Sequence, residues 1–480
     1  MNMTQRQEAF SFAVNGSPLD TWAGPLAMAA GIEYREEYYT QRADPYAGGI
    51  SASTPATATE PCVDPSINCV NGDNWNAGNF HNGRGNYHVQ EIFVEFGVPL
   101  LNDTFWGKVD LSLAGRHARY STAGDANTWK VGLTWDTPLP GVRLRSIMSR
   151  DIRAPNLSEL FSPNQGLNGG INNTFLAGSP QQTVRQLNVG NPTLSPEKSQ
   201  TTEIGIVFQP EFLPGFQTSI DYWRIGVKQV IQSLGLQTVF DQCFRGFTQF
   251  CTQDNITTAN GVNVSAAATG APGTANQIVS VQSRAFNAAV LLTDGFDWES
   301  SYQFDLQDWD VPGSFTLRSL VTHVSKFIVD DGIPGTQTSR ELAGAVGGGG
   351  NSQTYNQSGG NVLNWKLNLV QSYQNDVWGI NLTERWYSGG VFTNRNTLVC
   401  AVGTCPRPTV QTPTINYNKV SAVMYLDVGV NWNITEHTQL YTKVDNVANT
   451  MPPDTGGQNA NNTLYDVIGR MYRVGVRFNN

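Results

Sequence analysis

The chain has 480 residues, of which 39% are hydrophobic and 14% charged, with a formal net charge of −9. The negative balance and the lack of a basic stripe argue against a nucleic-acid partner. The longest apolar run, Pro25–Ile32, is too short to cross a bilayer as a helix. A helical membrane protein is therefore excluded, whereas a large β-barrel remains compatible with this length as one domain.

Residues 1–16 contain neither a basic segment nor an apolar segment of the kind found in secretory signals. Taken alone, this start suggests a cytoplasmic protein. The strand pattern and the cysteines described below indicate an exported one instead. We therefore expect that the natural N-terminal part is absent from this chain.

Between Phe10 and Phe478 the chain contains about fifteen stretches in which apolar and polar residues alternate. The alternation is clearest in residues 108–116, 129–136, 363–369 and 422–433. In the last of these, the apolar positions are Ala422, Met424, Leu426, Val428, Val430 and Trp432. A period of two places these side chains on one face of a strand and the polar ones on the other.

Three features favour a membrane barrel over a soluble sheet. The polar face carries charges on many strands, as a water-filled interior requires, and the stretches are longer than the usual five or six residues. Aromatic residues also lie at the ends of the apolar faces, where they match interfacial girdles; they are Trp22, Tyr34, Trp129, Trp135 and Trp432. The sequence predicts an all-β fold, an antiparallel transmembrane β-barrel. A soluble, β-rich secreted protein is the alternative.

The gaps between the stretches alternate between short and long. The short gaps are predicted turns at residues 15–18, 100–104, 138–141, 210–215, 306–313, 375–376 and 435–436. The long gaps are predicted loops at residues 41–87, 151–196, 232–287, 331–361, 391–419 and 448–464. If the last strand ends in the periplasm, the turns are periplasmic and the long loops extracellular.

All six cysteines fall in the long gaps and form three local pairs. The predicted disulfides join Cys62 to Cys69, Cys243 to Cys251, and Cys400 to Cys405. Zinc bound by Cys62, Cys69, His81 and His88 is an alternative, although the spacing lacks the usual short knuckle. Free thiols are the other alternative.

Several strings resemble segments of TonB-dependent outer-membrane receptors. In chain order they are SRDIRAPNLSELFSP (residues 149–163), NPTLSPEKSQTTEIGIVF (191–208), GFQTSIDYWRIGVKQVI (215–231), KVDNVANTMPP (443–453) and GRMYRVGVRF (469–478). Their order and spacing are similar to those of the family over nearly the whole chain. Within the first string, the resemblance implies that Pro155 fixes the entry to a loop and that Leu160 and Phe161 fold inward as an anchor.

The resemblance implies a receptor that captures a scarce ligand, with a plug domain inside a barrel of about 22 strands. Proton-motive force, relayed by the TonB complex, would rearrange the plug. Residues 1–480 are then expected to form a single barrel domain, truncated at its N-terminus, without the plug and without about seven strands. The family usually ends on an aromatic residue, whereas here Phe478 is followed by two asparagines.

No catalytic motif is present: there is no nucleophile elbow, no zinc-protease helix and no phosphate-binding loop. We therefore expect no enzyme activity and no cofactor.

Four arginines near one predicted strand are candidates for attracting an anionic ligand: Arg143, Arg145, Arg150 and Arg153. The alternative is that they pair with interior carboxylates such as Glu33, Glu37 or Asp110. Loop aromatics, Trp75, Phe80, Tyr87 and Tyr355, would either stack on a ligand or pack the loops together.

The sequence thus predicts part of an outer-membrane receptor barrel of a Gram-negative bacterium. Its ligand would be a ferric siderophore, a cobalamin or an oligosaccharide. Its partners would be outer-membrane lipid and the TonB complex, the latter through a plug outside this chain. A passive porin-like channel and a soluble β-sandwich adhesion protein are the alternatives. We expect the chain to insert poorly by itself because a partial barrel leaves two unpaired edges.

Overall fold

A computed structural model describes residues 1–49, 74–75, 78–176, 178–252, 254–258, 261, 263, 278–330, 332, 339–346, 362–392, 398–399, 414–415, 419–453 and 464–478. Fifteen long strands form its main sheet, and each pairs antiparallel with the next in chain order. They are β1 (Asn2–Thr21), β2 (Gly24–Arg42), β4 (Gly83–Thr104), β5 (Gly107–Tyr120), β6 (Gly124–Asp136), β7 (Val142–Arg153), β10 (Glu197–Phe208), β11 (Phe216–Ser233), β13 (Ile278–Asp305), β14 (Ser314–Asp330), β16 (Trp365–Gln374), β17 (Trp378–Tyr387), β22 (Val423–Thr435), β23 (Thr438–Asp445) and β24 (Met471–Phe478). The predicted all-β class and the predicted number of strands are confirmed.

Short elements occupy the long gaps. Five strands extend the sheet to 20: β3 (Asn79–Phe80), β8 (Gln165–Asn172), β9 (Gln181–Val189), β12 (Ile256–Thr258) and β15 (Ser339–Glu341). Two small pairs are β18 (Gly390–Val391) with β21 (Lys419–Val420), and β19 (Leu398–Val399) with β20 (Thr414–Ile415). The helices are α1 (Pro45–Gly48), α2 (Leu157–Phe161), α3 (Leu236–Phe244), η1 (Thr248–Phe250) and η3 (Gln307–Trp309). No helix in the described ranges is long and apolar enough to span a bilayer.

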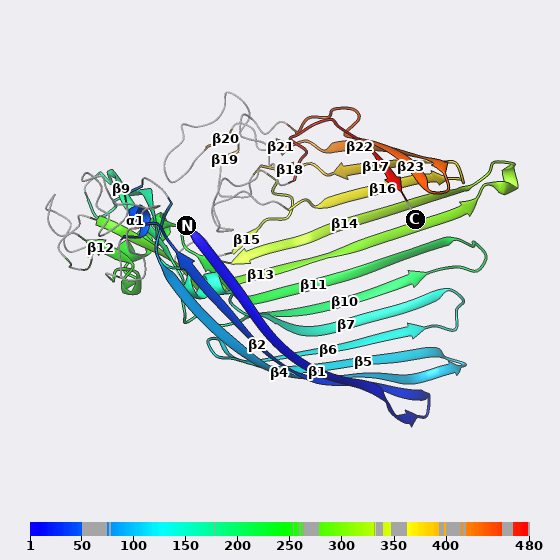
Figure 1. Ribbon diagram of the computed structural model, residues 1–480, viewed down its shortest axis with the longest axis horizontal. Helices are drawn as coiled ribbons and strands as arrows, with labels where there is room; N and C mark the ends of the chain where they lie inside the picture. Colours follow the sequence, from blue (N-terminus) through cyan, green and yellow to red (C-terminus); the bar gives the residue numbers. More distant parts are fainter. Residues whose placement is uncertain are drawn as a thin grey trace.

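The strands lie side by side in a strongly curved sheet (Figure 1). The elements α1, β9 and β12 gather at one end, which we call the long-loop end. The tight connections lie at the opposite end, the short-turn end. The last strand also finishes there, because Phe478 pairs with Thr438 at the start of β23. This asymmetry is the one that the gap lengths predict.

The two faces of the sheet differ in chemistry, as the alternation predicts. One face carries exposed apolar side chains, such as Phe12, Ile32 and Ile92, and we call it the outer face. The other carries buried charged residues, such as Glu91 and Asp427, and we call it the inner face. Helix α2 packs on the inner face of β2 and β4. The sheet therefore curves around its polar side.

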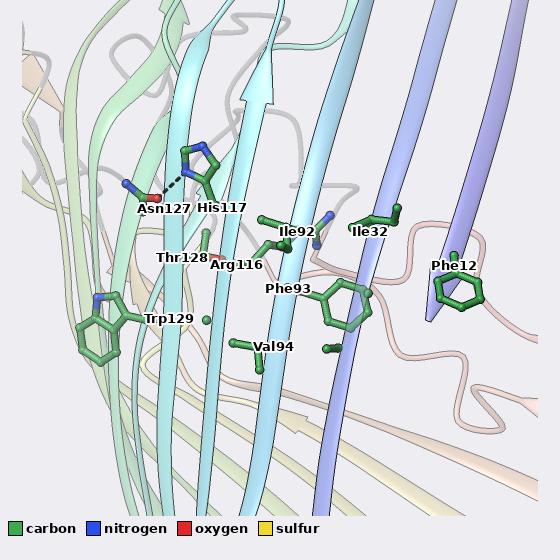
Figure 2. Close-up of a pocket in the computed structure, with 13 residues that line it drawn as sticks. Phe12, Ile32, Ile92, Phe93, Val94, Arg116, His117, Asn127, Thr128 and Trp129 are labelled. Carbon is green, nitrogen blue, oxygen red and sulfur yellow. Dashed lines mark hydrogen bonds between the residues drawn. The ribbon is translucent and has the colours of Figure 1, made fainter. Parts of the chain in front are cut away.

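A hollow of about 710 Å³ lies on the outer face across β1 to β6. Figure 2 shows the apolar side chains of Phe12, Ile32, Ile92 and Trp129 along neighbouring strands at this hollow. Next to them, the His117 ring nitrogen Nδ1 lies 2.8 Å from the amide oxygen of Asn127. The two polar groups, which lie in the same register row as Ile32 and Ile92, therefore satisfy each other.

Two of the predicted turns are placed wrongly. At residues 15–18 the strand continues through a shift in register between Gly16 and Leu19, and the reversal follows at Trp22 and Ala23. Likewise β4 continues to Thr104 instead of turning at residues 100–104. Asn, Gly and Pro indicate that the regular strand pairing is interrupted. They occur in β-bulges as well as in turns, so their presence does not fix where the chain reverses.

Both edges of the main sheet lack a partner within the described ranges. In the part of the chain that the structure describes, β1 pairs only with β2, and β24 pairs only with β23. Nearly every residue of β1 and β24 is exposed. Along both edges, backbone N–H and C=O groups are therefore left without partners from a neighbouring strand in the described ranges.

Candidate ligand-binding interior

The inner face is crossed by ion pairs that join neighbouring strands. The Arg145 guanidinium on β7 donates to the Asp221 carboxylate on β11 through two bonds, of 2.7 and 2.5 Å. Strand β10 lies between them, and its residue at this level is Gly205, which faces both partners in the register. A Cβ added to Gly205 would collide with Asp221 Oδ1. The glycine therefore leaves the space in which the ion pair spans two strands.

Substituting Gly205 by alanine is expected to open this ion pair and to destabilise the natural full-length protein by about 2 kcal/mol. The figure lies below the cost for a fully buried pair because the Arg145 side chain is partly exposed. The measurement is the temperature at which the folded gel band converts to the unfolded one. The matched control is Gly132→Ala, since a Cβ at Gly132 meets only ordinary contacts. Equal conversion temperatures for the two variants would contradict the proposed role of Gly205.

Arg153 joins three elements at the long-loop end. It donates to Glu197 at the start of β10 at 2.7 and 2.8 Å, and to Glu159 in α2 at 3.0 and 3.1 Å. Glu159 also closes the capping box of α2 with Asn156, at 2.8 Å in both directions. Arg153 thus ties the helix to the wall of the sheet.

Helix α2 is an apolar anchor at the long-loop end of the inner face. Leu160 is 1% exposed, and the Phe161 ring lies against the backbone of β4, where a Cβ at Gly85 would collide with it. The expected inward folding of Leu160 and Phe161 is therefore observed. Leu160 belongs to a cluster of buried side chains, against which Phe161 packs; its members are Tyr39, Tyr87, Val89, Ala118, Tyr120, Ala126, Leu157, Leu160, Leu194 and Ala285.

The four candidate arginines do not form one site. Arg143 pairs with Asp136 at the short-turn end, Arg145 with Asp221, and Arg153 with two glutamates at the long-loop end. Arg150 lies on the outer face: it pairs in register with Trp129 and Gln200, and no ion pair of it occurs in the described part of the chain. Their role toward a ligand stays a prediction.

The carboxylates expected to pair with these arginines have other partners. Glu33 and Glu37 both contact Arg35, at 3.1 and 3.3 Å, and Asp110 lies 3.3 Å from Lys108. Pairing as such was expected, but the strand register selects different residues for it.

A second inner-face group escaped the sequence reasoning. Arg385 on β17 lies 3.0 Å from Asp427 on β22, and its guanidinium sits 5.3 Å from the centre of the Tyr425 ring. Asp427 also accepts the backbone N–H of Asn446 at 2.8 Å. Both charged residues lie at polar positions of strands in which apolar and polar residues alternate. The alternation therefore predicts that they share the inner face, but it does not predict that they contact each other.

A small folded unit, the cap, stands above the long-loop end. It combines the β8–β9 hairpin, α3, η1, β12 and the first part of β13, which pairs parallel with β9. Its core contains Ile171, Phe175, Val184, Leu234, Leu236, Val239, Phe240, Cys243, Cys251, Ile256, Ile278 and Val281. The predicted disulfide between Cys243 and Cys251 is confirmed. Cys62, Cys69, Cys400 and Cys405 lie outside the described residues.

Removing the Cys243–Cys251 disulfide with two alanines is expected to weaken the cap by about 2–3 kcal/mol, because the bond restricts the unfolded chain between two residues that are 8 apart in sequence. The measurement is the rate of limited proteolysis within residues 236–258. Reduction of the unsubstituted protein serves as the control and should produce the same faster cleavage. Unchanged cleavage in both cases would show that packing alone holds the cap.

Asp241 in α3 makes the stability of the cap depend on pH. Burial raises the pKa of this carboxyl, although a hydrogen bond from Gln237 and the charge of Arg245 act in the opposite direction. The ionised form therefore costs stability as the pH rises through the folded pKa. Asp241→Asn is expected to slow hydrogen exchange in residues 236–244 at pH 8 and to have no effect at pH 4. Equal gains at both values would exclude this cause.

The loop aromatics divide into two groups. Tyr87 is buried in the cluster around α2, so it packs the rim. Trp75 is 51% exposed and lies 6.1 Å from the Tyr46 ring, and Phe80 is partly exposed. Tyr355 lies outside the described residues. Trp75 and Tyr46 therefore form a partly exposed aromatic pair in the described part of the long loops.

Solved structures with the same architecture span this chain almost completely. The siderophore receptor PirA from Acinetobacter baumannii has a TM-score of 0.60 at 15% identity, covering 99% of this chain and 55% of that one. The ferric enterobactin receptor PfeA from Pseudomonas aeruginosa, a mutant in complex with enterobactin, has a TM-score of 0.60 at 16% identity, covering 99% and 54%. The iron transporter FrpB from Neisseria meningitidis has a TM-score of 0.55 at 14% identity, covering 99% and 56%.

The chain thus spans about half the length of these structures, and at such identities the likeness shows the fold alone. A comparison with curated proteins gave no match. The family described as "TonB dependent receptor-like, beta-barrel" matches residues 2–447. Because that match covers more than half of the chain, it shows that the chain belongs to the family of TonB-dependent receptor β-barrels.

Proposed function

We propose that this chain forms much of the barrel wall of an outer-membrane receptor that imports a ferric siderophore in a Gram-negative bacterium. The observation that carries the proposal is the family match over residues 2–447 on a sheet with one apolar and one charged face. An apolar outer face suits lipid, and a charged inner face suits a wet interior. The partners that follow are outer-membrane lipid and the energy-coupling TonB complex.

The ligand class is favoured by the neighbours. PirA and PfeA are siderophore receptors by name, and one PfeA structure contains enterobactin. The interior of this chain is consistent with a bound polar molecule, because its arginines and carboxylates are fixed in pairs across strands and the exposed Trp75 lies at the long-loop end. A preorganised wall of this kind binds a ligand without rearranging its own charges. We infer a role in binding and transport without catalysis.

The test is uptake of radiolabelled candidate ligands by the natural host, compared with a strain that lacks the gene and a strain that lacks TonB. The probes are ferric enterobactin, a ferric hydroxamate, cyanocobalamin and a maltooligosaccharide. The proposal expects uptake of one ferric chelate to be lost in both mutant strains. Loss of cobalamin or sugar uptake in both mutant strains would show that the ligand is a cobalamin or an oligosaccharide instead of a ferric siderophore. Uptake that persists without TonB would favour the porin-like alternative.

A further inference from the structure

Four positive side chains cluster on the outer face, at the long-loop end of three adjacent strands. They are Arg150 on β7, Lys198 on β10, and Arg224 and Lys228 on β11. These strands lie side by side (Figure 1). The four side chains line a shallow cavity of about 620 Å³, whose remaining walls include Gln200, Thr202 and Val290. We call this group the outer basic cluster.

The charges of the outer basic cluster are not compensated within the described part of the chain. Lys198 lies directly opposite Lys228 in the β10–β11 ladder, an arrangement that costs stability because like charges face each other. Among the described residues no ion pair involves any of the four, whereas Arg143, Arg145 and Arg153 on the inner face are all paired. The paired wall inside and the unpaired cluster outside serve different purposes.

Two carboxylates lie in the neighbouring ladder. Asp330 on β14 is opposite Val290, which lines the cavity. Asp294 on β13 is opposite Arg224, but it is also opposite Lys326 on β14. Because Lys326 balances Asp294 and Asp330 adds one further negative charge, the region keeps an excess of three positive charges on a surface that the family places in a membrane.

The cluster lies directly next to the apolar belt. On the same face, Met148 follows Arg150, and Tyr222 follows Arg224, each two residues nearer the short-turn end. Ile204 continues the row on β10, and all three apolar side chains are exposed. Two residues of a strand span about 7 Å. A molecule with an anionic head and apolar tails would thus contact both surfaces at once.

We propose that the outer basic cluster binds the phosphate groups of a phosphorylated glycolipid of the outer leaflet. This inference rests on the proposed membrane location, not on the identity of the imported ligand. Guanidinium groups bind phosphate oxygens in a two-bond geometry, and lysines add point charges. A phosphate between Lys198 and Lys228 would remove their repulsion. The acyl chains would lie on Met148, Ile204 and Tyr222, and a soluble anion lacks this second contact.

The test measures glycolipid binding to the natural full-length protein, purified in detergent and stripped of lipid. The probe is lipid A with two phosphate groups, quantified as bound copies by native mass spectrometry. The test variant carries Lys198→Gln, Arg224→Gln and Lys228→Gln. The matched control is Arg119→Gln, because Arg119 is also an exposed cation at the long-loop end of the outer face but lies near Asp125, at 3.8 Å. Heat-modifiable migration verifies folding, and Lys198→Gln alone replaces the triple variant if that variant does not fold.

We expect the triple variant to bind this lipid at least about tenfold more weakly, in line with the loss of three charge contacts, and the control to bind as the natural protein does. Lipid A lacking its phosphates should bind weakly to every form, and inorganic phosphate should not compete. Equal binding by the triple variant, equal binding of the dephosphorylated lipid, or full competition by inorganic phosphate would each overturn the proposal. Iron uptake is measured separately, so a wrong ligand class leaves this result standing.

Discussion

The 480-residue chain, refolded by itself in detergent, is expected to migrate at one position in a gel whether or not it is heated. Intact barrels resist the detergent until they are heated and then change their migration. Here β1 and β24 have no partner in the described ranges, so two rows of backbone N–H and C=O groups face the surroundings. In hydrocarbon each unsatisfied group costs several kcal/mol. Many such groups along β1 would outweigh the gain from the apolar outer face.

A suitable control is the full-length PirA receptor, which has the same fold and should show two gel positions. A heat-dependent shift of the isolated chain would contradict the expectation. It would mean that β1 and β24 close the sheet into a smaller barrel.

Arg153→Ala is expected to have the second large effect, destabilising the long-loop end by about 2–3 kcal/mol. The change leaves Glu159 and Glu197 without their shared cation, and the Glu197 side chain is only 12% exposed. Glu197 also accepts the backbone N–H of Ile231 at 2.8 Å, so it cannot turn away freely. Helix α2 should therefore loosen, and hydrogen exchange in residues 156–161 should accelerate.

Arg150→Ala is the matched control, because Arg150 lies three residues earlier on the same strand and contacts no carboxylate in the described part of the chain. It should leave exchange in α2 unchanged. Similar exchange in the two variants would show that Arg153 has no structural role in holding α2.

Iron-chelate uptake adds a second readout: if Arg145→Ala and Arg153→Ala leave uptake of every anionic chelate unchanged, the idea that these arginines attract the ligand is wrong.

The alternation of apolar and polar residues made the sheet predictable, because all odd-numbered side chains of a strand point to one face and all even-numbered ones to the other. In β22 the apolar positions Met424, Val430 and Trp432 are exposed on the outer face, and Tyr425 and Asp427 are buried on the inner one. The same rule places Arg150 on the outer face and Arg145 and Arg153 on the inner face, because odd- and even-numbered residues of a strand point to different faces. That signal was present in the sequence but was not used.

The contacts inside the site depended on information that no single strand contains. The partner of Arg145 follows from the register of three strands and from Gly205, which makes room between them. The cap was missed for a related reason. Its strands β8, β9 and β12 are short and its helix is only nine residues long, so residues 151–196 and 232–287 show no sustained period.

The central claim is that lipid contacts the outer face of the sheet and water contacts the inner face. Nitroxide labels placed one at a time at residues 424–433 of the natural full-length protein, reconstituted in lipid, report this directly. We expect oxygen to reach the labels at Met424, Val428 and Trp432 best, and a water-soluble nickel chelate to reach those at Asp427 and Asn431 best. Collision rates that show no period of two, or a protein that stays monodisperse in water without detergent, would contradict a membrane-spanning barrel wall.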